Sequence, residues 1–373
     1  MVMPCRVSKK PRAVQENALR ISGDAVSRSL AAGACYLGPY SLKRRLLARK
    51  RLTSIFYHDV VSVSPLPEIP LFIDRETFWQ HIDRLAGQYT FIGLGDLVSR
   101  SAIPRYPLFL SFDGYSREYL AVAEALSARG LKATFYLITE PIQRERPHWV
   151  QRLYYVFRHL KAGRVAVELG GNPFSVEVSG TPSGNMEASR TLHAHMDSLA
   201  DPYAMVEELA KRYGVSMEKF DVAYPPLTVE EVARLAALPG IEVGSHSHRH
   251  ITRPDLDDAS AREEIEVSKG LLDKWTGKPV AHYAYPSGRV PDRMPRLLEQ
   301  AGYQTAATTV AKLHRPYVPP EWPYRIPRYC VHNGPFYRLA GQIAGVHKVM
   351  EVLSRLRHRK GGMHGRQPED AGY

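Results

Sequence analysis

Short apolar runs of β type alternate with longer helical patterns from about residue 53 onward, and this alternation restricts the possible folds more than any other feature of the chain. The expected strands are Ser54 to Tyr57, Leu108 to Phe112, Ala133 to Ile138, Ile241 to Gly244, His282 to Tyr285 and Thr305 to Thr308. The expected helices between them are Arg75 to Leu85, Arg117 to Arg129, Val229 to Ala237, Asp258 to Trp275 and Arg293 to Ala301. Such spacing suits parallel strands joined by crossover helices, so the predicted fold class is α/β, either an open doubly wound sheet or a barrel.

One long stretch, about residues 143–221, breaks this rhythm. It carries its own helical pattern (His148 to Leu160), an alternating hairpin-like pair (Val165 to Leu169 and Phe174 to Val178) and a further helix (Pro202 to Tyr213). The stretch is far longer than the usual connection of about 2 to 6 residues. We therefore predict an insertion within one domain.

The positive charge of the chain is concentrated at its two ends. The whole sequence has 50 Lys and Arg against 38 Asp and Glu, a formal net charge of +12. Residues 1–52 hold twelve of the basic residues and two acidic ones, and residues 345–373 are also basic, so the middle is close to neutral. A folded nucleic-acid binder usually carries its basic stripe on the domain itself, and no recognition-module signature is present. No nucleic-acid partner is expected.

The first 52 residues predict a basic segment outside the domain. They lack an uninterrupted apolar signal run, and the chain has no stretch of about 18 apolar residues. Residues 30–52 could lie on an anionic membrane surface or form a solvated helix that docks on its own domain. The three cysteines are widely separated without C-x-x-C spacing, which favours a reducing compartment. We expect a cytoplasmic protein, with peripheral contact at the inner membrane face as one alternative.

Polar residues follow three of the expected strands, where parallel sheets place their reacting groups. Asp113 ends one strand, His246 and His250 follow another, and a Pro-Ser-Gly turn follows the third. One helical turn would bring the rings of His246 and His250 onto the same face, with His248 pointing away. Two imidazoles and the Asp113 carboxylate would leave metal coordination positions open for water and substrate. From the spacing alone, a histidine-rich surface loop is the alternative.

Six motifs in a fixed order resemble the polysaccharide deacetylase family, also called the NodB-homology family or carbohydrate esterase family 4. They are Tyr57-His58-Asp59-Val60, Ser111-Phe112-Asp113-Gly114-Tyr115, Gly130 to Leu137, Gly244 to His250, Tyr283 to Gly288 and Leu297 to Tyr303. The resemblance covers residues 53–345, with residues 1–52 and 346–373 as basic flanking segments. It implies a distorted, partly open (β/α) barrel, here with the insertion.

The resemblance also implies the chemistry, which is metal-dependent removal of an acetyl group from an amino sugar or an esterified sugar. The metal, usually zinc, would be held by Asp113, His246 and His250, and a bound metal lowers the pKa of water toward roughly 7. The backbone N–H of Ser287 would stabilise the oxyanion. The implied partner is an acetylated glycan in a surface polysaccharide or its lipid-linked precursor.

The chain departs from the family pattern at the first acidic motif, which has one aspartate where the family has two. Counting forward from Phe112 makes Asp113 the general base, whereas counting back from Gly114 makes Asp113 the metal ligand; we favour the second because more positions match. Loss of a base slows a reaction by roughly 10²- to 10⁴-fold, and Glu118 could substitute. His332 or His58 could act as the general acid. The alternative function is a catalytically impaired family member that binds a glycan or a partner protein.

Overall fold

The structure is a computed structural model, and it describes residues 52–98, 104–253, 256–309 and 322–344. The chain divides into two compact units, one formed by residues 1–47 and 335–363 and the other by residues 48–334 and 364–373. The described element of the first unit is α14 (Phe336–Ala344). The basic segments at residues 1–51 and 346–373 lie outside the described residues. The location and membrane contact proposed for them stay predictions.

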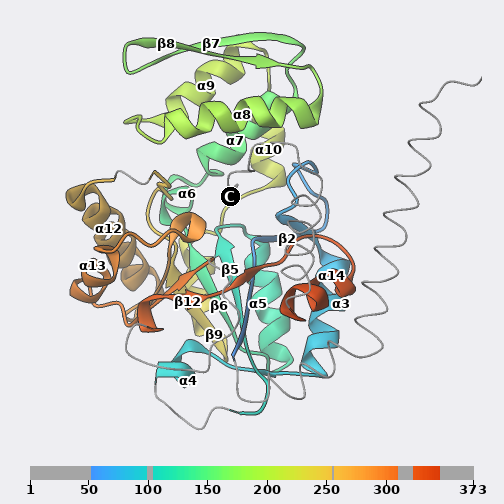
Figure 1. The fold of residues 1–373 in the computed structure, drawn as a ribbon, viewed down its shortest axis with the longest axis vertical. Helices are drawn as coiled ribbons and strands as arrows, with labels where there is room; N and C mark the ends of the chain where they lie inside the picture. The colour runs from blue at the N-terminus through green and yellow to red at the C-terminus, as the bar shows by residue number, and fades with distance from the viewer. Residues whose placement is uncertain (1–51, 99–103, 254–255, 310–321, 345–373) are drawn as a thin grey trace, which may run out of the picture. The chain divides into compact units, whose positions relative to one another are not determined.

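The second unit is built on a curved parallel sheet (Figure 1). Within the described ranges the sheet has nine strands in the order β12-β11-β10-β9-β6-β5-β1-β13, with β4 also paired to β5. The strands are β1 (Thr53–Tyr57), β4 (Thr90–Phe91), β5 (Pro107–Gly114), β6 (Ala133–Leu137), β9 (Ile241–Ser245), β10 (His282–Ala284), β11 (Thr305–Thr308), β12 (Ile326–Pro327) and β13 (Tyr329–Cys330). The two end strands, β12 and β13, are consecutive in the chain and separated by Arg328 alone. The sheet is therefore a nearly closed barrel, and the predicted (β/α) barrel is confirmed.

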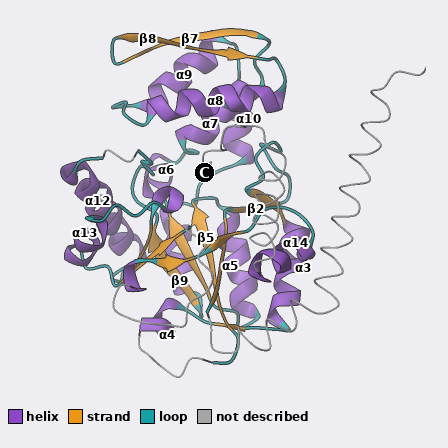
Figure 2. Cartoon of the chain, viewed as in Figure 1, coloured by secondary structure: helices purple, strands orange, loops and turns teal. Residues whose placement is uncertain are grey.

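Helices join the strands close to the predicted ranges (Figure 2). They are α3 (Arg75–Ala86), α4 (Leu94–Val98), α5 (Glu118–Ala128), α11 (Val229–Ala237), α12 (Asp258–Thr276) and α13 (Met294–Gln300). Local sequence fixes where several of them begin. Asp74 accepts a hydrogen bond from the Thr77 N–H at the start of α3, and Thr228 and Glu231 form a reciprocal capping box at the start of α11. A small parallel pair, β2 (Asp59–Val61) and β3 (Phe72–Asp74), lies outside the main sheet.

The insertion between β6 and α11 forms a helical layer with a hairpin. The short α6 (Thr139–Arg144) follows β6. The elements of the insertion after it are α7 (Trp149–Arg158), β7 (Gly163–Leu169), β8 (Asn172–Val178), α8 (Pro182–Met196), α9 (Pro202–Arg212) and α10 (Glu218–Ala223). The antiparallel pair β7 and β8 agrees with the predicted hairpin, whereas α8 was not anticipated. Figure 1 shows the insertion, in green and yellow-green, beyond the end of the barrel toward which the strand arrows point.

Alternation along β5 decides which side chains face the barrel interior. Phe109 belongs to the buried cluster that includes Tyr136 of β6 and Ala307 of β11, so residues 109, 111 and 113 share the inner face. Phe112 points to the other face, where its ring stacks on Phe135 with centroids 4.4 Å apart. Asp113, near the carboxyl end of β5, therefore faces the interior of the barrel. No helix among the described residues has the length and apolar character needed to span a membrane.

Candidate active site

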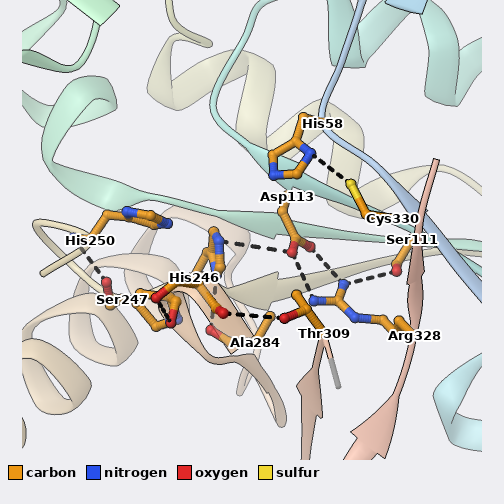
Figure 3. A network of polar contacts seen from close by, with 12 residues as sticks. His58, Ser111, Asp113, His246, Ser247, His250, Ala284, Thr309, Arg328 and Cys330 are labelled. Carbon is orange, nitrogen blue, oxygen red and sulfur yellow. Dashed lines mark hydrogen bonds and ion pairs between the residues drawn. The ribbon is translucent and has the colours of Figure 1, made fainter. Parts of the chain in front are cut away.

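Asp113 is buried at the carboxyl end of β5 and forms an ion pair with Arg328 (Figure 3). The pair is bidentate, because Arg328 Nη1 donates to Asp113 Oδ1 and Nη2 donates to Oδ2, each at 2.7 Å. Nη1 also donates to Ser111 Oγ at 3.0 Å. Bidentate contacts of this type are strong and directional, so they fix the plane of the carboxylate.

Arg328 itself is completely buried, with 0% of its surface exposed. It is the single residue between β12 and β13, and its guanidinium lies 4.4 Å from the centre of the Phe56 ring and 5.1 Å from that of Tyr136. A buried guanidinium needs an anion, and Asp113 is the carboxylate that it contacts. Arg328 is not among the site residues predicted from the sequence. The available signal was an arginine inside the otherwise apolar β-type stretch from Ile326 to Val331.

His246 follows β9 and points its ring toward Asp113. Its Nδ1 lies 2.9 Å from the Ala284 carbonyl oxygen, so Nδ1 carries the hydrogen and donates it. Nε2 therefore presents a lone pair, and it lies 3.8 Å from Asp113 Oδ2. Two hydrogen-bond acceptors thus face each other across a short gap.

His250 lies against His246, with ring centroids 4.7 Å apart. The predicted proximity is present, but the segment that carries both residues is irregular and not helical, which corrects the argument from one helical turn. His250 instead has a left-handed backbone conformation with φ 57°. His248 points elsewhere, as predicted, and its Nδ1 contacts Thr139 Oγ1 at 2.9 Å.

Burial and the Arg328 charge set the ionisation of this cluster. Burial lowers the pKa of His246. Burial and repulsion from the neighbouring imidazoles lower the pKa of His250 well below its ordinary value. Both rings are therefore neutral at pH 7. Burial raises the pKa of Asp113, but the charge of Arg328 and its two hydrogen bonds outweigh this effect and hold the pKa below its ordinary value. At neutral pH the cluster is a carboxylate beside two neutral imidazoles.

The remaining predicted residues come from other segments of the chain. His58 directly follows β1, and burial lowers its pKa to about 4; its Nδ1 lies 3.7 Å from Cys330 Sγ. His332 is exposed just after β13. Ser287 has φ 50° in the turn after β10, and its carbonyl accepts a hydrogen bond from Thr309 Oγ1 at 3.1 Å. Glu118 forms an exposed ion pair with Arg75. The roles assigned to these residues stay predictions.

In the alignment counted forward from Phe112, Gly114 would occupy the position of the family's second aspartate, and its surroundings exclude that side chain. A Cβ atom at this position would lie 2.5 Å from Tyr119 Oη and 3.5 Å from Asp59 Oδ1. Asp59 is buried, accepts a hydrogen bond from Tyr224, and has no partner among the described residues for Oδ1. Burial raises the pKa of Asp59 to about 7. The space beside Gly114 is thus already occupied by a tyrosine and another carboxyl group.

The metal site implied by the resemblance is incomplete in this arrangement. The orientation of His246 fits a metal ligand, because such histidines usually donate their other ring N–H to a carbonyl or carboxylate. Both oxygens of Asp113, however, are bonded to Arg328. Across the described ranges, no group of three His, Cys, Asp or Glu side chains could hold a metal ion. The three predicted ligands do not fit a metal as they stand, and we assign no step of the reaction to one.

Comparisons with known proteins agree with the fold and with part of the site. The family model for polysaccharide deacetylase matches residues 202–306, which include His246 and His250 but not Asp113. BA0330 from Bacillus anthracis, assigned as a polysaccharide deacetylase, is 16% identical with a TM-score of 0.51, over 79% of this chain and 69% of that chain. The resemblance to the polysaccharide deacetylases is confirmed. IcaB from Ammonifex degensii is also 16% identical, with a TM-score of 0.50 over 79% of this chain and 96% of that chain.

The sequence match and the fold match differ in what they cover. The polysaccharide deacetylase model begins at residue 202, inside the insertion, and ends in β11. The structural matches cover 79% of this chain, which is more than the 105 residues matched by the family model. A search of curated proteins found no match to this chain.

Proposed function

We propose that this chain is a hydrolase that removes acetyl groups from an acetylated carbohydrate. The proposal is supported by the family-model match and by the barrel fold. The observation that carries it is the gap of 3.8 Å between His246 Nε2 and Asp113 Oδ2, two acceptors at the carboxyl end of the barrel strands. One water can donate a hydrogen to each of them, which directs an oxygen lone pair outward toward an acetyl carbon.

Each residue then has a defined part in hydrolysis. Water attacks the acetyl carbon, and its proton passes to Asp113 or His246. Charge develops on the former carbonyl oxygen, where the Ser287 N–H would stabilise it. The bond from the acetyl carbon to the sugar nitrogen or oxygen breaks, and the leaving atom receives the proton that Asp113 or His246 took from the water, with His58 or His332 as the group that passes it on. Acetate then departs.

The finer parts of the proposal concern the substrate and the metal. We propose a polysaccharide or a lipid-linked amino sugar as the substrate, within assembly of an extracellular polysaccharide. A divalent ion, zinc by the family resemblance, remains part of the proposal through His246 and His250. Asp113 would become a ligand only if its contacts with Arg328 changed, since both of its oxygens are engaged.

Acetate release tests the proposal. Purified protein is incubated with oligomers of N-acetylglucosamine and with O-acetylated sugar polymers, and zinc content is measured on the same samples. We expect acetate from the wild type and at least a 100-fold loss in Asp113→Asn and His246→Ala, because both acceptors are removed in turn. His159→Ala is the matched control, since the His159 ring is exposed and contacts the carbonyl of Tyr155.

A second function is favoured by one specific observation. Asp113 is already neutralised by Arg328 and has no second aspartate beside it, as in a family member that binds a glycan without cleaving it. In that case the wild type releases no acetate from any substrate with or without added zinc. Glycan binding, measured by calorimetry, would then weaken in Asp113→Asn but not in His159→Ala.

A further inference from the structure

The loop from Ser247 to Thr252, which carries His250, has a strained backbone. Ser247 has φ 66° and His250 has φ 57°, and neither residue is a glycine. A left-handed conformation is unfavourable for residues with a side chain, and it persists only where the surroundings impose it. The contacts that hold this loop therefore decide where the His250 ring lies.

The barrel side of the loop is held near the start of α6 and by α12. The backbone N–H of Thr139 donates to the Ser247 carbonyl at 3.3 Å, and that of Glu140 donates to the His248 carbonyl at 3.0 Å. From α12, Glu264 accepts a hydrogen bond from the Arg249 N–H at 2.8 Å. The contacts from α6 and α12 end at residue 249, and within the loop the His250 N–H donates to Ser247 Oγ at 3.0 Å.

The next contacts come from the insertion. His148, buried at the start of α7, donates from Nε2 to the Arg249 carbonyl at 3.0 Å. Asp197, at the end of α8, accepts from Thr252 through its N–H at 3.2 Å and its Oγ1 at 2.8 Å. The Asp197 side chain is only 6% exposed, so these bonds are shielded from water. His250 lies between the two points of attachment.

We propose that the insertion positions His250 against His246, and that His148 and Asp197 are the positioning residues. His148 fixes the carbonyl immediately before His250, and Asp197 fixes the residue two positions after it. The insertion is thereby a structural part of the hydrolytic site. Only the activity measurement below rests on the proposed function.

The reactivity of the His250 ring gives a test that does not depend on activity. Diethyl pyrocarbonate modifies neutral imidazoles, and the rate at His250 can be followed by mass spectrometry of the peptide that contains it. We expect this rate to rise at least threefold in Asp197→Ala and in His148→Leu. Ser198→Ala is the matched control, because Ser198 is adjacent to Asp197, is exposed and donates from Oγ to the His195 carbonyl of the same helix end.

Steady-state kinetics gives the second measurement. We expect kcat to fall at least tenfold in both variants with KM changed less than threefold, because a displaced reacting group lowers the rate without removing substrate contacts. Circular dichroism confirms that each variant is folded. If Asp197→Ala does not fold, Thr252→Val removes the Oγ1 bond alone and should raise the His250 modification rate about twofold.

The possible outcomes separate the two proposals. Unchanged His250 reactivity in folded Asp197→Ala and His148→Leu would overturn the positioning role. Faster modification without any acetate release from the wild type would uphold the positioning role and remove the deacetylase. Equal effects in Ser198→Ala would show that the helix end, and not the bond to Thr252, is responsible, and this too would overturn the inference.

Discussion

Replacing Asp59 by asparagine should make the protein less sensitive to alkaline pH. The pKa of this buried carboxyl is about 7, against 3.8 for an ordinary aspartate. The folded state therefore holds the proton more tightly than the unfolded state, and stability falls as pH rises from about 4 through 7. A difference of about 3 pKa units corresponds to about 4 kcal/mol once the group is fully ionised, at 1.36 kcal/mol for each unit.

Part of this loss lies within a convenient pH range. Between pH 5 and pH 8.5 the two pKa values imply a change of about 3 kcal/mol in the free energy of unfolding. Asparagine does not ionise, so the difference in stability between Asp59→Asn and the wild type should shift by this amount in favour of the variant. The Tyr224 hydroxyl can still donate to the amide oxygen.

Urea unfolding followed by tryptophan fluorescence at pH 5 and pH 8.5 measures the shift. Asp292→Asn is the control, because the Asp292 side chain is 102% exposed and loses no hydration on folding. A difference between Asp59→Asn and the wild type that is the same at both pH values, to within about 1 kcal/mol, would refute the argument that burial controls this carboxyl.

Three further predictions concern the site and its surroundings. Arg328→Leu should destabilise the protein by about 3 to 5 kcal/mol in urea unfolding, because it leaves the buried Asp113 carboxylate without its cation. Arg325→Leu is the control, because it removes an exposed ion pair and should cost about 1 kcal/mol or less. Gly114→Asp should lower the melting temperature and give no gain in acetate release, because the new side chain would collide with Tyr119 Oη. Increased acetate release would contradict the conclusion that there is no room for an aspartate side chain beside Tyr119. Burial lowers the pKa of His148 to about 3, so the unfolded state takes up a proton at this residue before the folded state does as pH falls below about 6.5. Between pH 7 and pH 4 the wild type should therefore lose about 3 kcal/mol more free energy of unfolding than His148→Leu. Stability curves of the two proteins that run parallel over this pH range would contradict the prediction.

The barrel could be predicted because its elements are specified locally. The apolar run of β5, the capping residues of α3 and α11 and the regular alternation of strand and helix are all visible in short stretches of sequence. α8 was missed because its sequence is rich in small and polar residues and lacks a strong apolar stripe. The shortest strands, such as β12 with two residues, carry no periodicity that could identify them.

The site could be predicted only in part, because its contacts join distant segments. Asp113, His246 and His250 are recognisable by residue type at strand ends. The Asp113–Arg328 pair joins residues 215 positions apart, and it depends on how the sheet curves until its last strands meet its first. The surroundings of Gly114 likewise depend on Tyr119 and Asp59, which reach it from α5 and β2. Spacing along the chain contains no information about such contacts.

The segment from β12 to β13 closes the barrel, and the same segment carries Arg328. During synthesis, β5 leaves the ribosome more than two hundred residues before this segment does. Asp113 and Arg328 can pair only when the last strands reach the first, so the cation that compensates the buried carboxylate is in place only once the barrel is closed. A chain released before residue 328 would keep the strand that bears the carboxylate and lack both the closing strands and the compensating charge.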